Sequence, residues 1–201
     1  MKLAILVTPI AKSVPDIDGA DYIGVDAGGL KVLENHKSLA FAVGDFDSMS
    51  EADFKKLSLF TECIRHPIEK DETDSELAIR LAFEKGYEKV ILWGSFTGRI
   101  DHMFANVRLM MYRFPNLILM DECQRMMYLG VGEHCLKAEY KHCSFFAIRP
   151  STISFSGLLY NVNHREVDVK DIYMVSNSFC EKEAFVTVHK GGLLCIESNE
   201  K

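Results

Sequence analysis

Short apolar runs alternate with helix-like segments through residues 1–120, and this alternation constrains the fold more than any other feature of the sequence. The apolar runs predict buried strands over Leu3–Val7, Tyr22–Val25, Leu39–Val43, Lys89–Trp93 and Leu117–Met120. Helices are expected over Leu30–Asn35, from Ser50 onwards, over Thr73–Lys85 and from Asp101 to about Arg113. Strands that alternate with helices predict a mostly parallel sheet covered on both faces. We therefore expect a Rossmann-like α/β domain in this half of the chain.

Capping signals support two of these helices. Thr73 and Glu76 have the spacing of a capping box, in which the first side chain accepts a hydrogen bond from the backbone of the second. Ser50 and Asp53 come close to the same pattern. Gly86 is suited to end the helix that Thr73 begins, because glycine adopts a left-handed backbone easily.

The helical period largely disappears after about Asp121, and short alternating runs replace it. Strands are expected here over Met126–Leu129, Ser144–Ile148, Ile172–Val175, Ala184–His189 and Leu193–Ile196. Short strands separated by Gly, Asn and Ser predict an antiparallel sandwich or barrel. We therefore expect an α/β domain over residues 1–124 and an all-β domain over residues 125–201.

Charge and composition exclude several classes of protein. The net charge is −6 over 201 residues, which gives no electrostatic footprint for nucleic acid or anionic lipid. No run approaches the ~20 apolar residues of a membrane span, and Met1–Val7 lacks the longer apolar core of a signal peptide. The six cysteines form no Cys-x-x-Cys pair. We therefore expect a cytoplasmic protein with reduced thiols and no nucleic-acid or membrane partner.

Two His–Cys pairs, His134-Cys135 and His142-Cys143, raise the alternative of a zinc site. Zinc ligands usually occur in tighter pairs, and this segment alternates like strands. The residues therefore have both a structural and a zinc-binding interpretation.

Aspartates follow the predicted strands where each strand ends. Asp26 follows the second strand, Asp45 and Asp47 follow the third, Asp74 begins a helix, and Asp101 comes shortly after the fourth strand. Ligands of open parallel sheets bind beyond the carboxyl ends of the strands, so we expect these side chains to converge. A divalent cation relieves the repulsion between clustered carboxylates, and Mg²⁺ prefers carboxylates together with phosphate oxygens. The pattern predicts a magnesium site on a phosphate-bearing substrate.

Basic residues and glycines lie on the same predicted edge. Arg99 is suited to phosphate because its planar guanidinium can bind two oxygens at once, and Lys70 adds a second positive charge. Gly94 lets the backbone approach a ligand closely. A structural alternative stays open for each polar residue: Thr73 as a helix N-cap, and Asp101 as a cap or as the partner of Arg99.

Several motifs, in their order and spacing, resemble the thiamin pyrophosphokinase family over nearly the whole chain. They are Gly44-Asp45-Phe46-Asp47-Ser48, Lys70-Asp71-Glu72-Thr73-Asp74-Ser75-Glu76, Gly98-Arg99-Ile100-Asp101-His102 with Asn106, Ser156-Gly157-Leu158-Leu159-Tyr160, Val175-Ser176-Asn177 and Lys190-Gly191-Gly192-Leu193-Leu194. The chain departs from the family pattern at Thr8-Pro9, where the family has Asn-Gly, at Thr97, where it has Gly, and at Asn161, where it has Pro. The motifs are short, but the set in this order is specific.

The resemblance implies an enzyme, an ATP:thiamin diphosphotransferase that forms thiamin diphosphate and AMP. It implies Mg²⁺ as the cofactor, ATP as the co-substrate, and a homodimer with its active site between the subunits. The residues that it implies are Asp45, Asp47 and Asp74 for the metal; Lys70, Thr73, Gly94, Arg99 and His102 for ATP; Asp26, Ser176 and Asn177 for thiamin; and Asp74, Arg99 and Asp101 for catalysis.

Three alternative functions remain open at the level of the sequence. A diphosphokinase for another alcohol would use the same scaffold, and a metal-dependent phosphohydrolase would use the same aspartates. A non-enzymatic nucleotide or thiamin sensor would bind its ligand without turnover. Trp93, the single tryptophan, lies in a predicted core strand, so an aromatic that stacks on thiamin must be another residue, with Phe155, Tyr173 and Phe179 as candidates.

Overall fold

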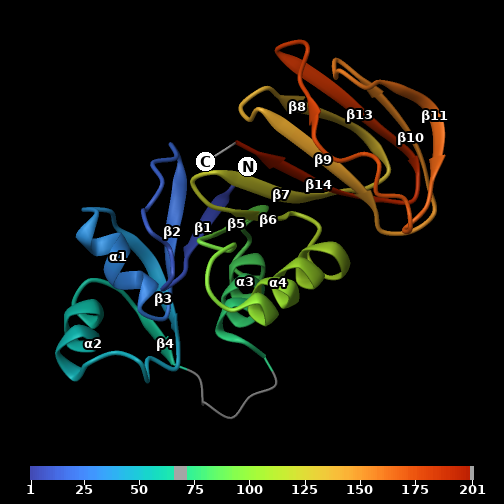
Figure 1. Ribbon diagram of the computed structural model, residues 1–201. Helices are drawn as coiled ribbons and strands as arrows, with labels where there is room; N and C mark the ends of the chain where they lie inside the picture. Colours follow the sequence, from blue (N-terminus) through green and yellow to red (C-terminus); the bar gives the residue numbers. More distant parts are fainter. Residues whose placement is uncertain (66–71, 200–201) are drawn as a thin grey trace. The chain divides into compact units, whose positions relative to one another are not determined.

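A computed structural model of the chain describes residues 1–65 and 72–199, which form two compact units (Figure 1). The N-terminal unit comprises Met1–Leu109 and Asn116–Glu122, and the C-terminal unit comprises Met110–Pro115 and Cys123–Lys201. Each unit has its own buried core. The assignment of separate binding roles to two domains stays a prediction.

Parallel strands form the sheet of the N-terminal unit, in the order β6-β5-β1-β2-β3-β4. They are β1 (Leu3–Val7), β2 (Ala20–Val25), β3 (Leu39–Gly44), β4 (Cys63–Arg65), β5 (Lys89–Trp93) and β6 (Leu117–Met120). The predicted parallel sheet is confirmed. Only β4 was not expected, because a strand of three partly exposed residues at the sheet edge gives almost no apolar signal.

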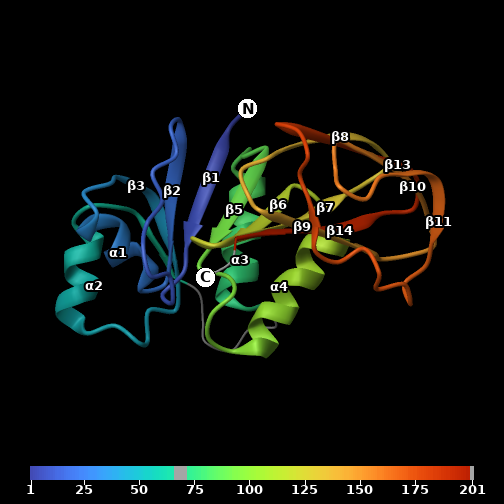
Figure 2. The ribbon, with the colours of Figure 1, turned by 45° about the horizontal axis from the view of Figure 1, so that its top comes forward.

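Helices lie on both faces of this sheet, as the alternation predicts. Figures 1 and 2 show α1 (Gly28–Glu34) and α2 (Glu51–Ser58) on one face, and α3 (Asp74–Glu84) and α4 (Ile100–Tyr112) on the other. Close packing of α1 depends on glycine, since a Cβ atom on Gly24 of β2 would lie 2.5 Å from the Cα atom of Gly29. The glycines thus let the first turn of α1 pack directly against β2.

The predicted caps of α2 and α3 are confirmed. The Ser50 hydroxyl accepts a hydrogen bond from the Asp53 amide, and the Thr73 hydroxyl accepts one from the Glu76 amide, each at 3.1 Å. The expected cap of α4, Asp101, was two residues late. The Met103 amide donates to the carbonyl of Arg99, so the helix begins at Ile100 and Asp101 lies in its first turn rather than capping it.

Two antiparallel sheets form the C-terminal unit, with strand orders β12-β9-β14-β7 and β11-β10-β13-β8. The strands are β7 (Gln124–Leu129), β8 (Gly132–Lys137), β9 (His142–Ala147), β10 (Ser151–Ser156), β11 (Val162–Val167), β12 (Asn177–Ser178), β13 (Glu183–Lys190) and β14 (Leu193–Ser198). Both sheets contribute to one core, in which the rings of Phe145 from β9 and Phe155 from β10 lie 4.5 Å apart. The expected β domain is therefore confirmed as a two-sheet structure.

One expected strand of this unit was wrong. Ile172–Val175 has the composition of a strand but forms none. Only Met174 is buried, whereas Ile172 is 73% exposed and Val175 is 47% exposed. The apolar run thus lies along the surface of the unit instead of in its core.

No helix within residues 1–65 and 72–199 combines the length and apolar character needed to cross a membrane. All six cysteines are free thiols.

Candidate functional site

Three carboxylates converge at one end of the N-terminal sheet. Asp26 directly follows β2, Asp45 directly follows β3, and Asp74 is the first residue of α3. One carboxylate oxygen of each lies within 4.8 Å of the other two. The convergence expected from the strand ends is therefore confirmed for these three aspartates, and we name them the acidic cluster.

The environment of Asp26 fits a ligand of a divalent cation. Its Oδ1 atom is buried and has no hydrogen-bond partner among the described residues, while its Oδ2 atom accepts a bond of 3.4 Å from the Ser48 hydroxyl. Burial raises the pKa of Asp26, and the nearby charges of Asp45 and Asp74 raise it further. A cation would satisfy the buried oxygen and remove the repulsion, so these residues fit the magnesium ion that the motifs predict.

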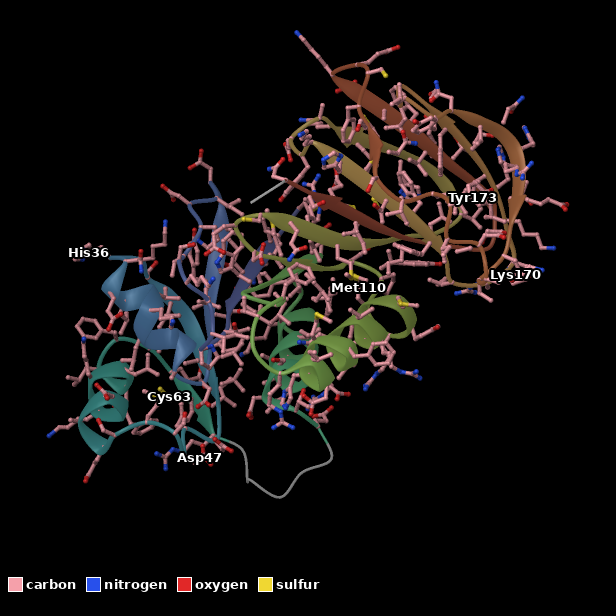
Figure 3. The ribbon with its side chains drawn as sticks, in the orientation of Figure 1. His36, Asp47, Cys63, Met110, Lys170 and Tyr173 are labelled. Carbon is pink, nitrogen blue, oxygen red and sulfur yellow. The ribbon has the colours of Figure 1, made fainter. Side chains whose placement is uncertain are left out.

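Asp47, the third predicted metal ligand, is exposed just beyond the end of β3 (Figure 3). Its backbone amide donates to the Asp45 Oδ1 atom at 3.1 Å, which shapes the turn between the two aspartates. Phe46 is buried between them with φ of 57°, and its ring packs 5.2 Å from that of Phe54. The buried ring fixes the turn, and the Asp47 charge contributes to the raised pKa of Asp26.

A cavity of about 190 Å³ lies in the N-terminal unit beside the ends of β1 and β5. It is lined by Thr8, Pro9, Ile10, Ser75, Gly94, Ser95, Thr97, Arg99, His102, Met103 and Asn106. The strand order reverses between β1 and β5, and open α/β sheets bind ligands at such switch points. Ser75 directly follows Asp74, so the cavity adjoins the acidic cluster.

The residues predicted to bind ATP divide into three groups. Gly94, Arg99 and His102 line this cavity. Thr73 does not line it, and its hydroxyl is already bonded as the cap of α3. Lys70 lies outside the described residues.

The catalytic candidates Arg99 and Asp101 form an exposed ion pair. The Arg99 Nη2 atom lies 2.6 Å from the Asp101 Oδ2 atom, and its Nε atom lies 3.1 Å from Oδ1. This hydrogen bonding to the guanidinium lowers the pKa of Asp101. The Asp101 carboxylate is thus stabilised as an anion and is a weaker proton acceptor than Asp26.

Sequence reasoning gave no role to Thr8, which fixes the floor of the cavity. Its buried hydroxyl donates to the Gly94 carbonyl at 3.1 Å. Gly94 has φ of 82°, and a Cβ atom there would lie 2.7 Å from the Cα atom of Ala11. The departure from the family pattern at Thr8-Pro9 was the signal for this contact, because it places a hydroxyl at the end of a central strand.

The residues predicted to bind thiamin in the C-terminal unit are differently placed. Asn177 is 5% exposed; its Oδ1 atom accepts bonds of 3.0 Å from the amides of Tyr160 and Ser178, and its Nδ2 atom donates to the Tyr160 carbonyl at 2.9 Å. Ser176 is exposed with φ of 59°. Asn177 therefore holds the segment at Tyr160, and its contact with thiamin stays a prediction.

A second cavity, of about 230 Å³, lies within the C-terminal unit. It is lined by Phe155, Tyr160, Val162, Tyr173, Met174, Val175 and Asn177. Among the candidate aromatics for stacking on thiamin, Tyr173, which is labelled in Figure 3, lines this cavity and is 54% exposed. Phe155 is buried against Phe145, and Phe179 packs against the core.

The His–Cys pairs have structural surroundings. The ring of His134 lies 2.8 Å from the Gly130 carbonyl through its Nε2 atom. Burial and the charge of Glu197 raise the pKa of Cys143 to about 12, so that thiol keeps its proton. Within the part of the chain that is described, the aspartates of the acidic cluster form the one group of three metal-binding side chains at suitable spacing.

Several known proteins are similar to this chain in sequence and in fold. The chain is 26% identical over 200 residues to the thiamine pyrophosphokinase of Bacillus subtilis (strain 168), covering 93% of this chain and 94% of the relative. A solved thiamin pyrophosphokinase family protein from Enterococcus faecalis is 26% identical, covers 100% of both chains and has a TM-score of 0.87. A solved structure from Bacillus subtilis has a TM-score of 0.89 at 22% identity and covers 100% of both chains, which shows the shared fold.

Two family models divide the chain between them. Residues 19–120 match the model described as thiamin pyrophosphokinase, catalytic domain, and these residues include the acidic cluster. Residues 133–193 match the model described as thiamin pyrophosphokinase, vitamin B1 binding domain. The chain therefore belongs to the thiamin pyrophosphokinase family.

Proposed function

We propose that this protein transfers a diphosphate group from ATP to the hydroxyl of thiamin, which gives thiamin diphosphate and AMP. The observation that carries this proposal is the acidic cluster, in which three carboxylates and one orphaned buried oxygen adjoin a cavity at the switch point of the sheet. Membership of the family supplies the reaction to which this geometry is suited.

In this proposal the acidic cluster holds Mg²⁺ on the polyphosphate. The ion neutralises phosphate charge when bound, which is the main requirement of phosphoryl-type transfer. Asp47 lies near enough to add its charge to the cluster. Asp74 begins α3, where the positive end of the helix also favours phosphate oxygens.

Chain residues then position the two reacting groups. The thiamin hydroxyl forms a bond to the β-phosphorus of ATP, the bond from that phosphorus to the α-phosphate oxygen breaks, and AMP leaves. Arg99 is exposed and bonded only to Asp101 among the described residues, so it is available to exchange that partner for phosphate. Asp101 is proposed to orient the attacking hydroxyl or to accept the proton that this hydroxyl loses.

The thiamin side of the proposal involves Asp26, Ser176 and Asn177, together with Tyr173 as a surface for ring stacking. The cavity at Tyr160 and Tyr173 has the apolar, aromatic lining typical of sites for small organic molecules. A homodimer with its active site between subunits and a cytoplasmic location complete the proposal.

The test is to incubate the purified protein with ATP, Mg²⁺ and thiamin and to measure AMP and thiamin diphosphate by chromatography. We expect the two products in equal amounts, with both lost when a chelator is added. AMP release that does not depend on thiamin would instead identify a phosphohydrolase. Binding of both substrates with no product would identify a sensor.

A further inference from the structure

Asn106 on α4 is a polar residue of low exposure on the lining of the N-terminal cavity. It is only 7% exposed, yet its carboxamide has no hydrogen-bond partner among the described residues. The residue lines the cavity beside the acidic cluster. The carboxamide atoms are not among the fully enclosed polar atoms that lack a partner, so they are accessible from the cavity and can bond to a ligand there.

The walls of the cavity beside Asn106 are apolar. Pro9 and Ile10 form one wall, Met103 lies one turn of α4 before Asn106, and Ile10 is 46% exposed although it is a large hydrophobic residue. The volume of about 190 Å³ is smaller than the roughly 300–1,000 Å³ of pockets that enclose a whole small-molecule ligand. These walls and this size suit one flat ring with a polar edge.

We propose that Asn106 is a specificity-determining residue that recognises the adenine ring of ATP, an assignment that rests on the proposed function. A carboxamide presents an acceptor oxygen beside donor hydrogens, and adenine presents an amine beside an acceptor ring nitrogen, so the two groups form a pair of hydrogen bonds. On the edge that carries N7, guanine presents two acceptors, its carbonyl oxygen and N7, so a carboxamide cannot form this pair there in either orientation. Asn106 therefore favours ATP over GTP.

The aminopyrimidine ring of thiamin has the same amine beside a ring nitrogen. The position of the cavity favours adenine over the aminopyrimidine of thiamin. Arg99 and His102 lie on its lining, and Ser75, also on the lining, is next in sequence to Asp74 of the acidic cluster. A ring held at Asn106 then has the Arg99 guanidinium and the acidic cluster on the path of its phosphates. Measurements with both substrates distinguish the two rings.

The experiment measures the dissociation constants of Mg·ATP and Mg·GTP by calorimetry for the wild-type chain, Asn106→Asp and Asn106→Leu. In Asn106→Asp the carboxylate repels the adenine ring nitrogen and accepts the two N–H groups on one edge of guanine, so preference shifts toward GTP. We expect ATP binding to weaken by on the order of 10-fold or more, with a gain for GTP. Asn106→Leu keeps the branched shape without hydrogen-bonding groups and should bind both nucleotides with similar, weakened affinity.

Asn35→Asp is the matched control, because it makes the same change of charge at an exposed position of the N-terminal unit outside the cavity. It should keep the wild-type ratio of ATP to GTP affinity. An unchanged ratio in both Asn106 variants would overturn the proposal. A selective rise in the KM for thiamin with unchanged nucleotide affinity would also overturn it, and would assign the aminopyrimidine to this cavity.

The binding readout separates this inference from the proposed function. A reversed nucleotide preference in a protein that never forms thiamin diphosphate would remove the function and leave Asn106 as an adenine-recognising residue. If both Asn106 variants kept the wild-type ratio of ATP to GTP affinity while the protein formed thiamin diphosphate normally, the proposed function would stand and the role of Asn106 would be rejected.

Discussion

The two units each bury an asparagine, but the two side chains are bonded in opposite ways. Asn177 of the C-terminal unit, 5% exposed, forms three hydrogen bonds to the backbone of Tyr160 and Ser178. Asn106 of the N-terminal unit, 7% exposed, forms none to any described residue. The two residues are about equally buried but differ in their hydrogen bonds. We therefore infer that Asn177 stabilises the structure and that Asn106 is available to a ligand.

Carboxylates show the same contrast. In the C-terminal unit the Oε2 atom of the fully buried Glu197 lies 2.7 Å and 2.6 Å from the Nε and Nη2 atoms of Arg125, while its Oε1 atom has no hydrogen-bond partner among the described residues. In the N-terminal unit, Asp45 and Asp74 add to the cost of ionising Asp26 rather than reducing it. The C-terminal unit thus places a cation of the chain beside its buried carboxylate, whereas the charges named around Asp26 are all negative, which is the arrangement that a bound cation would relieve.

The largest effect that we expect is on catalysis, from Asp45→Asn. The substitution preserves the acceptor for the Asp47 amide but removes one charge from the acidic cluster. Turnover should fall by about 100-fold or more, because metal-bound charge stabilisation of a phosphoryl transfer is worth several kcal/mol. The measurement is thiamin-dependent AMP formation at saturating Mg²⁺.

Two comparisons make this result specific. Asp18→Asn removes the same charge from an exposed site of the same unit and should leave turnover unchanged. Asp47→Asn tests whether the exposed partner of the motif is a metal ligand, and a large loss of turnover would place it among the ligands. Wild-type turnover in Asp45→Asn would show that the cluster does not bind the catalytic metal.

The next largest effect is on stability, and it tests the contrast between the two asparagines directly. Asn177→Leu leaves the amide and carbonyl of Tyr160 unpaired and should lower the free energy of unfolding by about 1–3 kcal/mol. Asn106→Leu removes no hydrogen bond to a described residue and should change it by less than about 0.5 kcal/mol. Urea unfolding of both variants gives the comparison.

Equal destabilisation by the two substitutions would contradict the contrast. It would mean that Asn106 has a structural role, and the cavity would then lose its argument for a ligand. Asn161, exposed with its Oδ1 atom accepting from the Leu158 amide at 3.1 Å, offers an intermediate case, since Asn161→Leu removes a single exposed bond.

The fold of the N-terminal unit was predictable because most of its strands are buried on both faces and two of its helices, α2 and α3, carry side-chain caps. Leu3–Val7 and Lys89–Trp93 have the predicted bounds, and the Thr73 cap lies where its spacing with Glu76 places it. The C-terminal unit was less predictable. A strand with one exposed face, such as Val162–Val167, has four exposed residues in its burial pattern and little apolar signal.

The candidate site was predictable in part for the same reason. Asp26, Asp45 and Asp74 lie at ends of secondary structure, and the parallel topology brings such ends together. The sequence could not predict that Asn177 forms hydrogen bonds and that Asn106 forms none to a described residue. Both depend on which backbone groups lie nearby in space. The sequence gives the type of each residue, whereas its hydrogen-bond partners depend on how the chain packs.

The smallest effect that we expect is the stabilisation of the fold by Asp26→Asn. The pKa of Asp26 is raised above its ordinary value of 3.8, so between these two values the folded state binds more protons than the unfolded state. The free energy of unfolding of the wild-type chain therefore falls as pH rises through this interval. Asparagine cannot ionise and tolerates the φ of 51° at this position, so the variant should be more stable at neutral pH by about 1 kcal/mol.

Magnesium sharpens this last prediction, because the same repulsion that destabilises the wild-type chain is what a cation relieves. Thermal unfolding with and without Mg²⁺ should show a rise in Tm for the wild-type chain and a smaller rise for Asp26→Asn, since the ion binds only the folded acidic cluster. A variant that is less stable than the wild-type chain without metal would show that Asp26 contributes to folding instead of opposing it. An equal rise in Tm for both proteins would remove Asp26 from the metal site and leave thiamin as its predicted ligand.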